Sequence, residues 1–314
     1  MEMILIIIFL AIIAFTIGVL AFRPSQILTK EFVKSKMATP HSKFFHWKEN
    51  EIHYTDEGSG QVILMIHGLG GSFYNFQELS NQFIGEFRVI RVDIPGMGLS
   101  DFKHVKRDTN FLEEYTNFFQ EFVEHLEIKS FHIMGNSLGG MISWITTTVM
   151  PEKIESLTLI NSAGYDVKKV LVSAAGPIRW KWFSPVVTKG LPRRITNHCL
   201  TRPFADKSKV NPAELEFTYW NLNRKGNINT LTSLATSGQN PDEFLIKNIQ
   251  CPTLIIWGQE DIIIPVAHAY KFSNDIANSE VKIYSPCGHM AMMEFPDRVA
   301  NDFRNFIKDK IASA

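Results

Sequence analysis

Short apolar runs alternate with amphipathic segments from about residue 44 to the end of the chain, and this alternation constrains the fold most. The runs end in Gly-rich or polar sequence, as buried strands of a parallel sheet do. Strands that alternate with helices predict an α/β fold, with a mostly parallel sheet covered on both faces. After an opening β-hairpin at 44–56, the expected strands are 62–66, 87–93, 131–135, 154–160, 252–258 and 281–285.

One long interval interrupts this alternation. Roughly 90 residues separate the strands ending at Ile160 and beginning at Thr253, too many for a simple connection. The interval is rich in Pro, Trp and Phe, and is therefore too apolar to be disordered. We expect it to form a helical cap over one end of the sheet. The predicted division is an α/β core at 44–164 and 246–314, with the cap at 165–245.

The chain begins with an uncharged apolar segment, Met3–Phe22. As a helix it would reach roughly 30 Å, the hydrocarbon thickness of a bilayer. Glu2 precedes it without any Lys or Arg, and no good cleavage site follows, which favours a transmembrane anchor at 1–23 over a cleaved signal peptide. Export after signal cleavage and a buried core helix are the alternatives.

Residues 24–43 are predicted to be a basic linker. The stretch 23–50 has more Lys and Arg than Glu, so the positive-inside rule keeps the C-terminal part in the cytoplasm. The same basic stretch could lie against anionic headgroups or be a solvated connection.

Charge and motifs exclude several function classes. The 32 basic and 32 acidic side chains cancel, so nothing indicates nucleic acid as a partner. Cys199, Cys251 and Cys287 are far apart, which argues against a disulfide framework or structural zinc. No histidine spacing typical of a metal site and no nucleotide-binding glycine motif is present, so no metal and no cofactor are expected.

Gly135-Asn136-Ser137-Leu138-Gly139 is a G-x-S-x-G motif between an expected strand and an expected helix. This is the context of a nucleophile elbow, a tight turn whose flanking glycines let the serine project above the sheet. The motif therefore predicts Ser137 as a nucleophile. An accidental Gly-rich turn is the alternative.

A serine hydroxyl needs a base to accept its proton, and the base needs an acid to orient it. His289 is the expected base and Asp261 the expected acid, because each follows a strand by a short loop at the sheet's carboxyl edge. Glu260 competes with Asp261 for the role of the acid. Asp166, after the preceding strand, is a more distant candidate.

Acyl transfer also needs N–H donors for the oxyanion. The backbone N–H of Leu138, directly after the nucleophile, is one expected donor of the oxyanion hole. The second is Leu69 N–H, in the His67–Gly71 loop whose glycines let the backbone approach a substrate. His67 is expected to be structural, hydrogen-bonded beneath that loop.

Together these motifs resemble the α/β-hydrolase superfamily over about residues 44–312. The resemblance rests on HGLGG (67–71), VDIPGMGLSD (92–101), GNSLGG (135–140), GQEDIIIP (258–265) and CGHMAMMEFP (287–296). It implies an eight-stranded sheet, a cap between strands six and seven, a Ser–Asp–His triad and no cofactor. Within the superfamily, the elbow is most similar to those of bacterial serine lipases and esterases, and the layout resembles membrane-anchored monoacylglycerol lipases.

The resemblance and the predicted anchor together imply a membrane-anchored serine hydrolase for carboxylic esters. The anchor favours substrates that partition into lipid, such as monoacylglycerols or fatty-acyl esters. The alternative is a meta-cleavage-type carbon–carbon bond hydrolase with the same triad. Those enzymes typically have a Pro-containing oxyanion loop and a Trp directly after the catalytic histidine. Here the loop is HGLGGS and Met290 follows His289. A non-catalytic binding module with this fold usually lacks a triad member, and none is missing.

Overall fold

The computed structural model describes residues 9, 26–106, 108–167 and 189–311, and contains one sheet of eight strands in the order β1-β2-β4-β3-β5-β6-β7-β8. In this part of the chain, β1 and β4 each pair antiparallel with β2, and every other neighbouring pair is parallel. The strands are β1 (Ser42–Trp47), β2 (Asn50–Gly58), β3 (Val62–Ile66), β4 (Arg88–Val92), β5 (Phe131–Asn136), β6 (Ile154–Ile160), β7 (Thr253–Gly258) and β8 (Ser279–Tyr284). The expected eight-stranded, mostly parallel α/β sheet is therefore confirmed.

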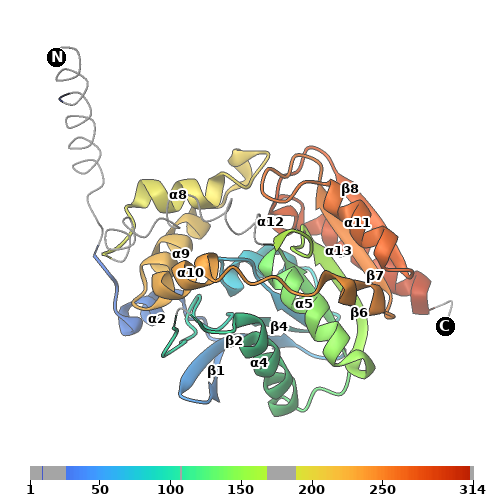
Figure 1. Ribbon diagram of the computed structural model, residues 1–314, viewed down its shortest axis with the longest axis horizontal. Helices are drawn as coiled ribbons and strands as arrows, with labels where there is room; N and C mark the ends of the chain where they lie inside the picture. The colour runs from blue at the N-terminus through green and yellow to red at the C-terminus, as the bar shows by residue number, and fades with distance from the viewer. Residues whose placement is uncertain (1–8, 10–25, 107, 168–188, 312–314) are drawn as a thin grey trace.

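Helices pack on both faces of this sheet (Figure 1). The described helices are α2 (Lys30–Met37), α3 (Gln77–Asn81), α4 (Phe111–His125), α5 (Leu138–Val149), α8 (Arg193–Thr201), α9 (Pro212–Asn223), α10 (Asn227–Thr236), α11 (Ala267–Asp275), α12 (Ala291–Glu294) and α13 (Pro296–Ile311). Short 3₁₀ turns are η1 (Phe73–Phe76), η2 (Pro151–Lys153), η4 (Lys207–Lys209) and η5 (Glu243–Asn248).

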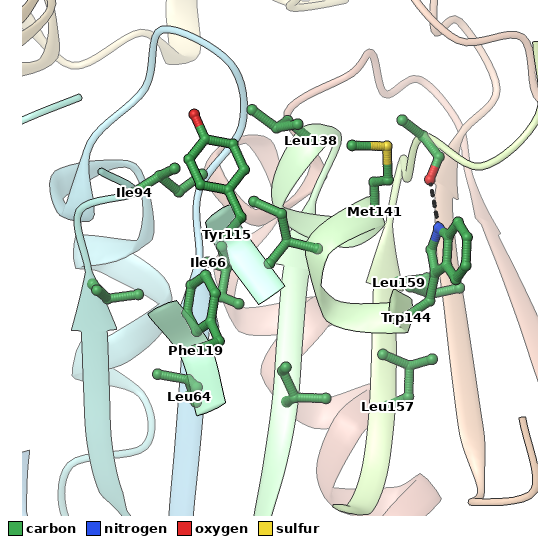
Figure 2. Packing of buried hydrophobic residues seen from close by; sticks show 14 of the residues in the cluster. Leu64, Ile66, Ile94, Tyr115, Phe119, Leu138, Met141, Trp144, Leu157 and Leu159 are labelled. Atoms are coloured by element: carbon green, nitrogen blue, oxygen red, sulfur yellow. Dashed lines mark hydrogen bonds between the residues drawn. The ribbon is translucent and has the colours of Figure 1, made fainter. Parts of the chain in front are cut away.

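Strands β3, β5 and β7 are buried along their whole length because both faces of the sheet are covered. Successive side chains of a strand point to opposite faces. Leu64 and Ile66 of β3 therefore lie in the cluster that holds α4 and α5, as Figure 2 shows with Phe119. Ile63 and Met65 of the same strand lie in the second cluster, with α3 and α13.

One prediction is wrong in part, because the basic segment 24–43 is not a linker throughout. Part of it forms α2, whose N-cap Thr29 accepts a hydrogen bond from Phe32 N at 3.2 Å. Val33 and Met37, four residues apart on one helix face, are fully buried, and α2 packs against α9. Because lysines surround this pair of residues, the sequence pattern does not indicate a packed helix here.

Three helices, α8, α9 and α10, occupy the described part of the interval between β6 and β7, where the sequence predicts a helical cap. Figure 1 shows them grouped to one side of the sheet, with α9 above α2. Residues 168–188 of the interval lie outside the described residues, and the boundaries 165–245 remain a prediction.

The segment Met3–Phe22 lies outside the described residues except for Phe9, whose side chain is exposed. Among the residues that the structure does describe, none of the helices is both long and apolar enough to cross a bilayer.

A buried histidine in β5 makes stability depend on pH. Burial lowers the pKa of His132 from 6.5 to about 4. Its Nδ1 lies 2.7 Å from Ser156 Oγ, and its ring packs edge-on against Phe87 and Phe303. The unfolded chain binds this proton below about pH 6.5, and the folded chain only near pH 4. The folded state therefore loses stability as the pH falls through that window.

We expect wild type to lose about 2 kcal/mol more than His132→Phe between pH 7.5 and pH 5. Phenylalanine keeps the ring packing and removes the titrating group. Any other effect of the substitution on the free energy of unfolding is therefore the same at both pH values. Urea unfolding of both proteins at each pH measures the difference. If the free energy of unfolding changes equally with pH in both proteins, His132 is not the source of the pH dependence.

Candidate active site

Ser137 lies at the turn between β5 and α5, in a backbone conformation that side-chain-bearing residues rarely adopt (φ 54°, ψ −114°). The turn leaves no room beside it. A Cβ on Gly135 would lie 2.2 Å from Gly139 O, and a Cβ on Gly139 would lie 2.0 Å from Ile66 O. The two glycines of the motif are therefore required by close packing, and the strain at Ser137 has the geometry of a nucleophile elbow.

Asp261 and His289 are in direct contact. Asp261 Oδ2 accepts a hydrogen bond from His289 Nδ1 at 2.7 Å, and the carboxylate is fully buried. Its other oxygen, Oδ1, accepts from Ile263 N at 2.8 Å and Ile264 N at 2.9 Å. Because the carboxylate can only accept here, the proton sits on His289 Nδ1 and leaves Nε2 as a basic nitrogen.

Two asparagines for which the sequence predicts no role complete this arrangement. Asn161, just after β6, donates through Nδ2 to Asp261 Oδ2 at 2.8 Å and to Gly288 O at 3.2 Å. Asn136, the residue before Ser137, donates through Nδ2 to His289 O at 3.1 Å. The serine turn, the aspartate and the histidine loop are thus joined by buried amides. The signal in the sequence is weak: Asn136 ends β5 inside the G-x-S-x-G motif, and Asn161 directly follows β6.

The structure does not join all three predicted triad members directly. Within the described residues, no hydrogen bond connects Ser137 Oγ to His289 Nε2. Such bonds are often long in enzymes without substrate and tighten on binding. The role of Ser137 in a triad therefore stays a prediction, supported by its turn and by Asn136.

Glu260, the competing acid, points elsewhere. It accepts hydrogen bonds from Ser285 Oγ at 2.8 Å and from Cys287 N at 2.7 Å, and so holds the loop before His289 in place. Asp166, the more distant candidate, follows β6 with a positive φ of 50°. His289 Nδ1 bonds to Asp261 rather than to either of them.

The expected oxyanion loop lies directly beside Ser137. Gly71 N donates to Gly68 O at 3.0 Å, which closes a turn with Leu69 and Gly70 at its centre. Gly70 has φ +71°, as the third residue of a type II turn requires. A Cβ on Gly68 would lie 3.2 Å from Ser137 Cβ. The donor roles of Leu69 N–H and Leu138 N–H remain predictions.

His67 lies beneath this loop. Ile94 N donates to its Nε2 at 3.0 Å, so the ring proton is on Nδ1, which donates to Gly68 O at 2.8 Å. Complete burial lowers the pKa of His67 and keeps the imidazole neutral. Both ring nitrogens are thus committed to the backbone, and His67 supports the loop rather than acting as a base.

No group of three or more His, Cys, Asp or Glu side chains among the described residues is arranged to hold a metal ion. What the site offers chemically is a buried Asp–His pair beside a strained serine and a glycine turn. That combination is suited to nucleophilic acyl transfer.

The chain is similar to known hydrolases. A family model described as the alpha/beta hydrolase fold matches residues 61–296. The 2-hydroxy-6-oxo-6-(2'-aminophenyl)hexa-2,4-dienoic acid hydrolase of Metapseudomonas resinovorans is 27% identical over 269 residues, 82% of this chain and 87% of that protein. The 2-hydroxy-6-oxononadienedioate/2-hydroxy-6-oxononatrienedioate hydrolase of Escherichia coli K12 is 27% identical over 281 residues, 83% of this chain and 92% of that protein. The crystal structure of a membrane phospholipase A is similar in fold, with a TM-score of 0.73, 21% identity and full coverage of both chains.

Proposed function

Because the chain belongs to the alpha/beta hydrolase family, we propose that it is a serine hydrolase that cleaves carboxylic esters through an acyl-enzyme on Ser137. The observation that carries this proposal is the buried Asp261–His289 pair, with 2.7 Å between Oδ2 and Nδ1. A histidine whose Nδ1–H is held by a carboxylate presents Nε2 as the base that a serine nucleophile needs.

In the proposed mechanism, Ser137 Oγ attacks the ester carbonyl while His289 Nε2 accepts the hydroxyl proton. Asp261 stabilises the imidazolium that forms, and the N–H groups of Leu69 and Leu138 stabilise the oxyanion. His289 then gives its proton to the departing alcohol. A water molecule, deprotonated by His289, releases the acid and restores Ser137.

We propose lipid-like esters, such as monoacylglycerols or other fatty-acyl esters, as the substrate class. The support is the apolar segment Met3–Phe22, proposed as a single-pass anchor with the catalytic part on the cytoplasmic side. An enzyme held at a bilayer meets substrates that partition into it. Cleavage of the segment and export is the alternative localisation.

A second candidate is the hydrolysis of a carbon–carbon bond in a 2-hydroxy-6-oxodienoic acid, because both curated relatives described above carry such names. Two features of this chain argue against the carbon–carbon bond hydrolase. Leu69 stands in a loop without proline, HGLGGS, and Met290 rather than Trp follows His289.

The test compares p-nitrophenyl esters, with acyl chains from acetate to palmitate, against a 2-hydroxy-6-oxodienoic acid, using wild type and Ser137→Ala. Ester hydrolysis that requires Ser137 and increases with chain length supports the proposal. Turnover of the dienoic acid without turnover of any ester would replace it with the second candidate.

A further inference from the structure

Helix α9 reaches the oxyanion loop through one amide side chain. Asn221 is 2% exposed, and its Nδ2 donates to Gly70 O and to Gly71 O, both at 2.8 Å. Its Oδ1 accepts from Gly98 N at 2.8 Å and from Asn227 Nδ2 at 2.9 Å. Three of these four hydrogen bonds hold α9 on the core, and the fourth joins it to Asn227 at the start of α10.

The two carbonyls that Asn221 binds belong to the second half of the turn 68–71. The first half is held from below, where His67 Nδ1 donates to Gly68 O. Leu69 lies between these two attachments and is itself only partly buried. Leu69 N–H belongs to the same peptide unit as Gly68 O, so the bonds to Gly68 O hold this unit from one side, and the bonds from Asn221 hold the other end of the turn.

Further contacts hold α9 against the residues that follow the same loop. Glu214, two turns before Asn221, accepts a hydrogen bond from Asn75 Nδ2 at 3.3 Å, and Asn75 Oδ1 accepts from Ser72 N at 2.9 Å. Phe217 stacks on Tyr74, with 3.8 Å between ring centroids. Helix α9 therefore follows the chain from Gly70 to Asn75.

From these contacts we infer that Asn221 is a positioning residue for the oxyanion hole. The turn that carries Leu69 N–H is held in its catalytic geometry only while α9 is seated on the core, so that α9 and the oxyanion loop act as one unit. This inference rests on the proposed serine chemistry. Preorganised donors stabilise an oxyanion because they do not have to reorient during the reaction, and a loosened turn loses that advantage.

The variant that tests this is Asn221→Asp, which keeps the shape and the Oδ1 acceptor but places a carboxylate oxygen against the two carbonyls. We expect kcat for the preferred ester to fall about 10–100-fold, with KM changed less than about threefold. The rate constant for labelling of Ser137 by a fluorophosphonate should fall by a similar factor. In that reaction Ser137 Oγ displaces fluoride from phosphorus, and a phosphoryl oxygen takes the position of the oxyanion.

Asn223→Asp is the matched control. Asn223 lies on the same helix and is fully buried, and its amide bonds within the same chain interval, to Leu191 and to Tyr219 O. It has no contact with the oxyanion loop among the described hydrogen bonds. We expect kcat and the labelling rate of this variant to stay within about threefold of wild type.

Equal losses in the two variants, or a raised KM with unchanged kcat in Asn221→Asp, would overturn the inference. If Asn221→Asp does not fold, as judged by its thermal unfolding, Asn221→Ala removes the donor without adding a charge and takes its place. A wild type that reacts with the fluorophosphonate but hydrolyses no ester would refute the proposed substrate alone, and the labelling rates would still decide the role of Asn221.

Discussion

Replacing Ser137 with alanine is expected to lower kcat for ester hydrolysis by about 10⁴-fold or more, because the acyl-enzyme can no longer form. The strained turn tolerates alanine, which has the same backbone preferences and a smaller side chain. Initial rates with the preferred p-nitrophenyl ester, at enzyme concentrations high enough to detect the residual rate, measure the effect.

Ser143→Ala is the control for this substitution. Ser143 is fully buried in α5 and donates to Gly139 O at 2.7 Å, so it lies close to the elbow but away from the reacting atoms. We expect it to retain kcat within a few-fold of wild type. A Ser137→Ala protein that keeps more than about a tenth of the wild-type rate would refute covalent catalysis at Ser137.

The second large effect is expected for Asp261→Asn, with kcat lowered about 10³–10⁴-fold. Asp261 Oδ1 is fixed as an acceptor by Ile263 N and Ile264 N, so the new amide nitrogen must take the place of Oδ2. There it donates to His289 Nδ1, which moves the ring proton to Nε2 and removes the base. The amide of Asn161 can turn its oxygen toward the new nitrogen at the cost of its bond to Gly288 O, so we expect the protein to fold.

Glu260→Gln is the matched control, since Glu260 is the neighbouring carboxylate on the same loop and, among the described residues, its side chain accepts from Ser285 and Cys287 rather than from His289. Its kcat should remain within about tenfold of wild type, and the Asp261→Asn protein should give a thermal unfolding temperature close to that of wild type. If Glu260→Gln lowers kcat more than Asp261→Asn does, Glu260 is the orienting acid.

The sequence predicts the strands and the elbow because both depend on local patterns. The expected strands from 62–66 to 281–285 begin and end within two residues of the observed β3 to β8. The choice between Asp261 and Glu260 is different. Adjacent residues in a loop point in different directions, so only the geometry shows which carboxylate meets His289.

The amides around the site could not be predicted from their surroundings in the sequence. Asn161 meets Asp261 across 100 residues, and Asn221 meets Gly71 across 150. Asparagine is also common in turns and at helix ends, where its side chain bonds locally. Nothing in the local pattern separates an amide that caps its own helix from one that holds a distant loop.

The docking of α2 decides where the chain can be shortened for work on its catalytic part. Leu28 exchanges backbone hydrogen bonds with Asn223 O and Lys225 N, and Lys30 Nζ lies 2.7 Å from Asp101 Oδ2. Starting the protein at residue 44, where the α/β pattern begins in the sequence, would remove these bonds and expose the apolar surface that Val33 and Met37 cover. A shortened protein should therefore start before Leu28, which removes the apolar segment but leaves the support of α9 intact.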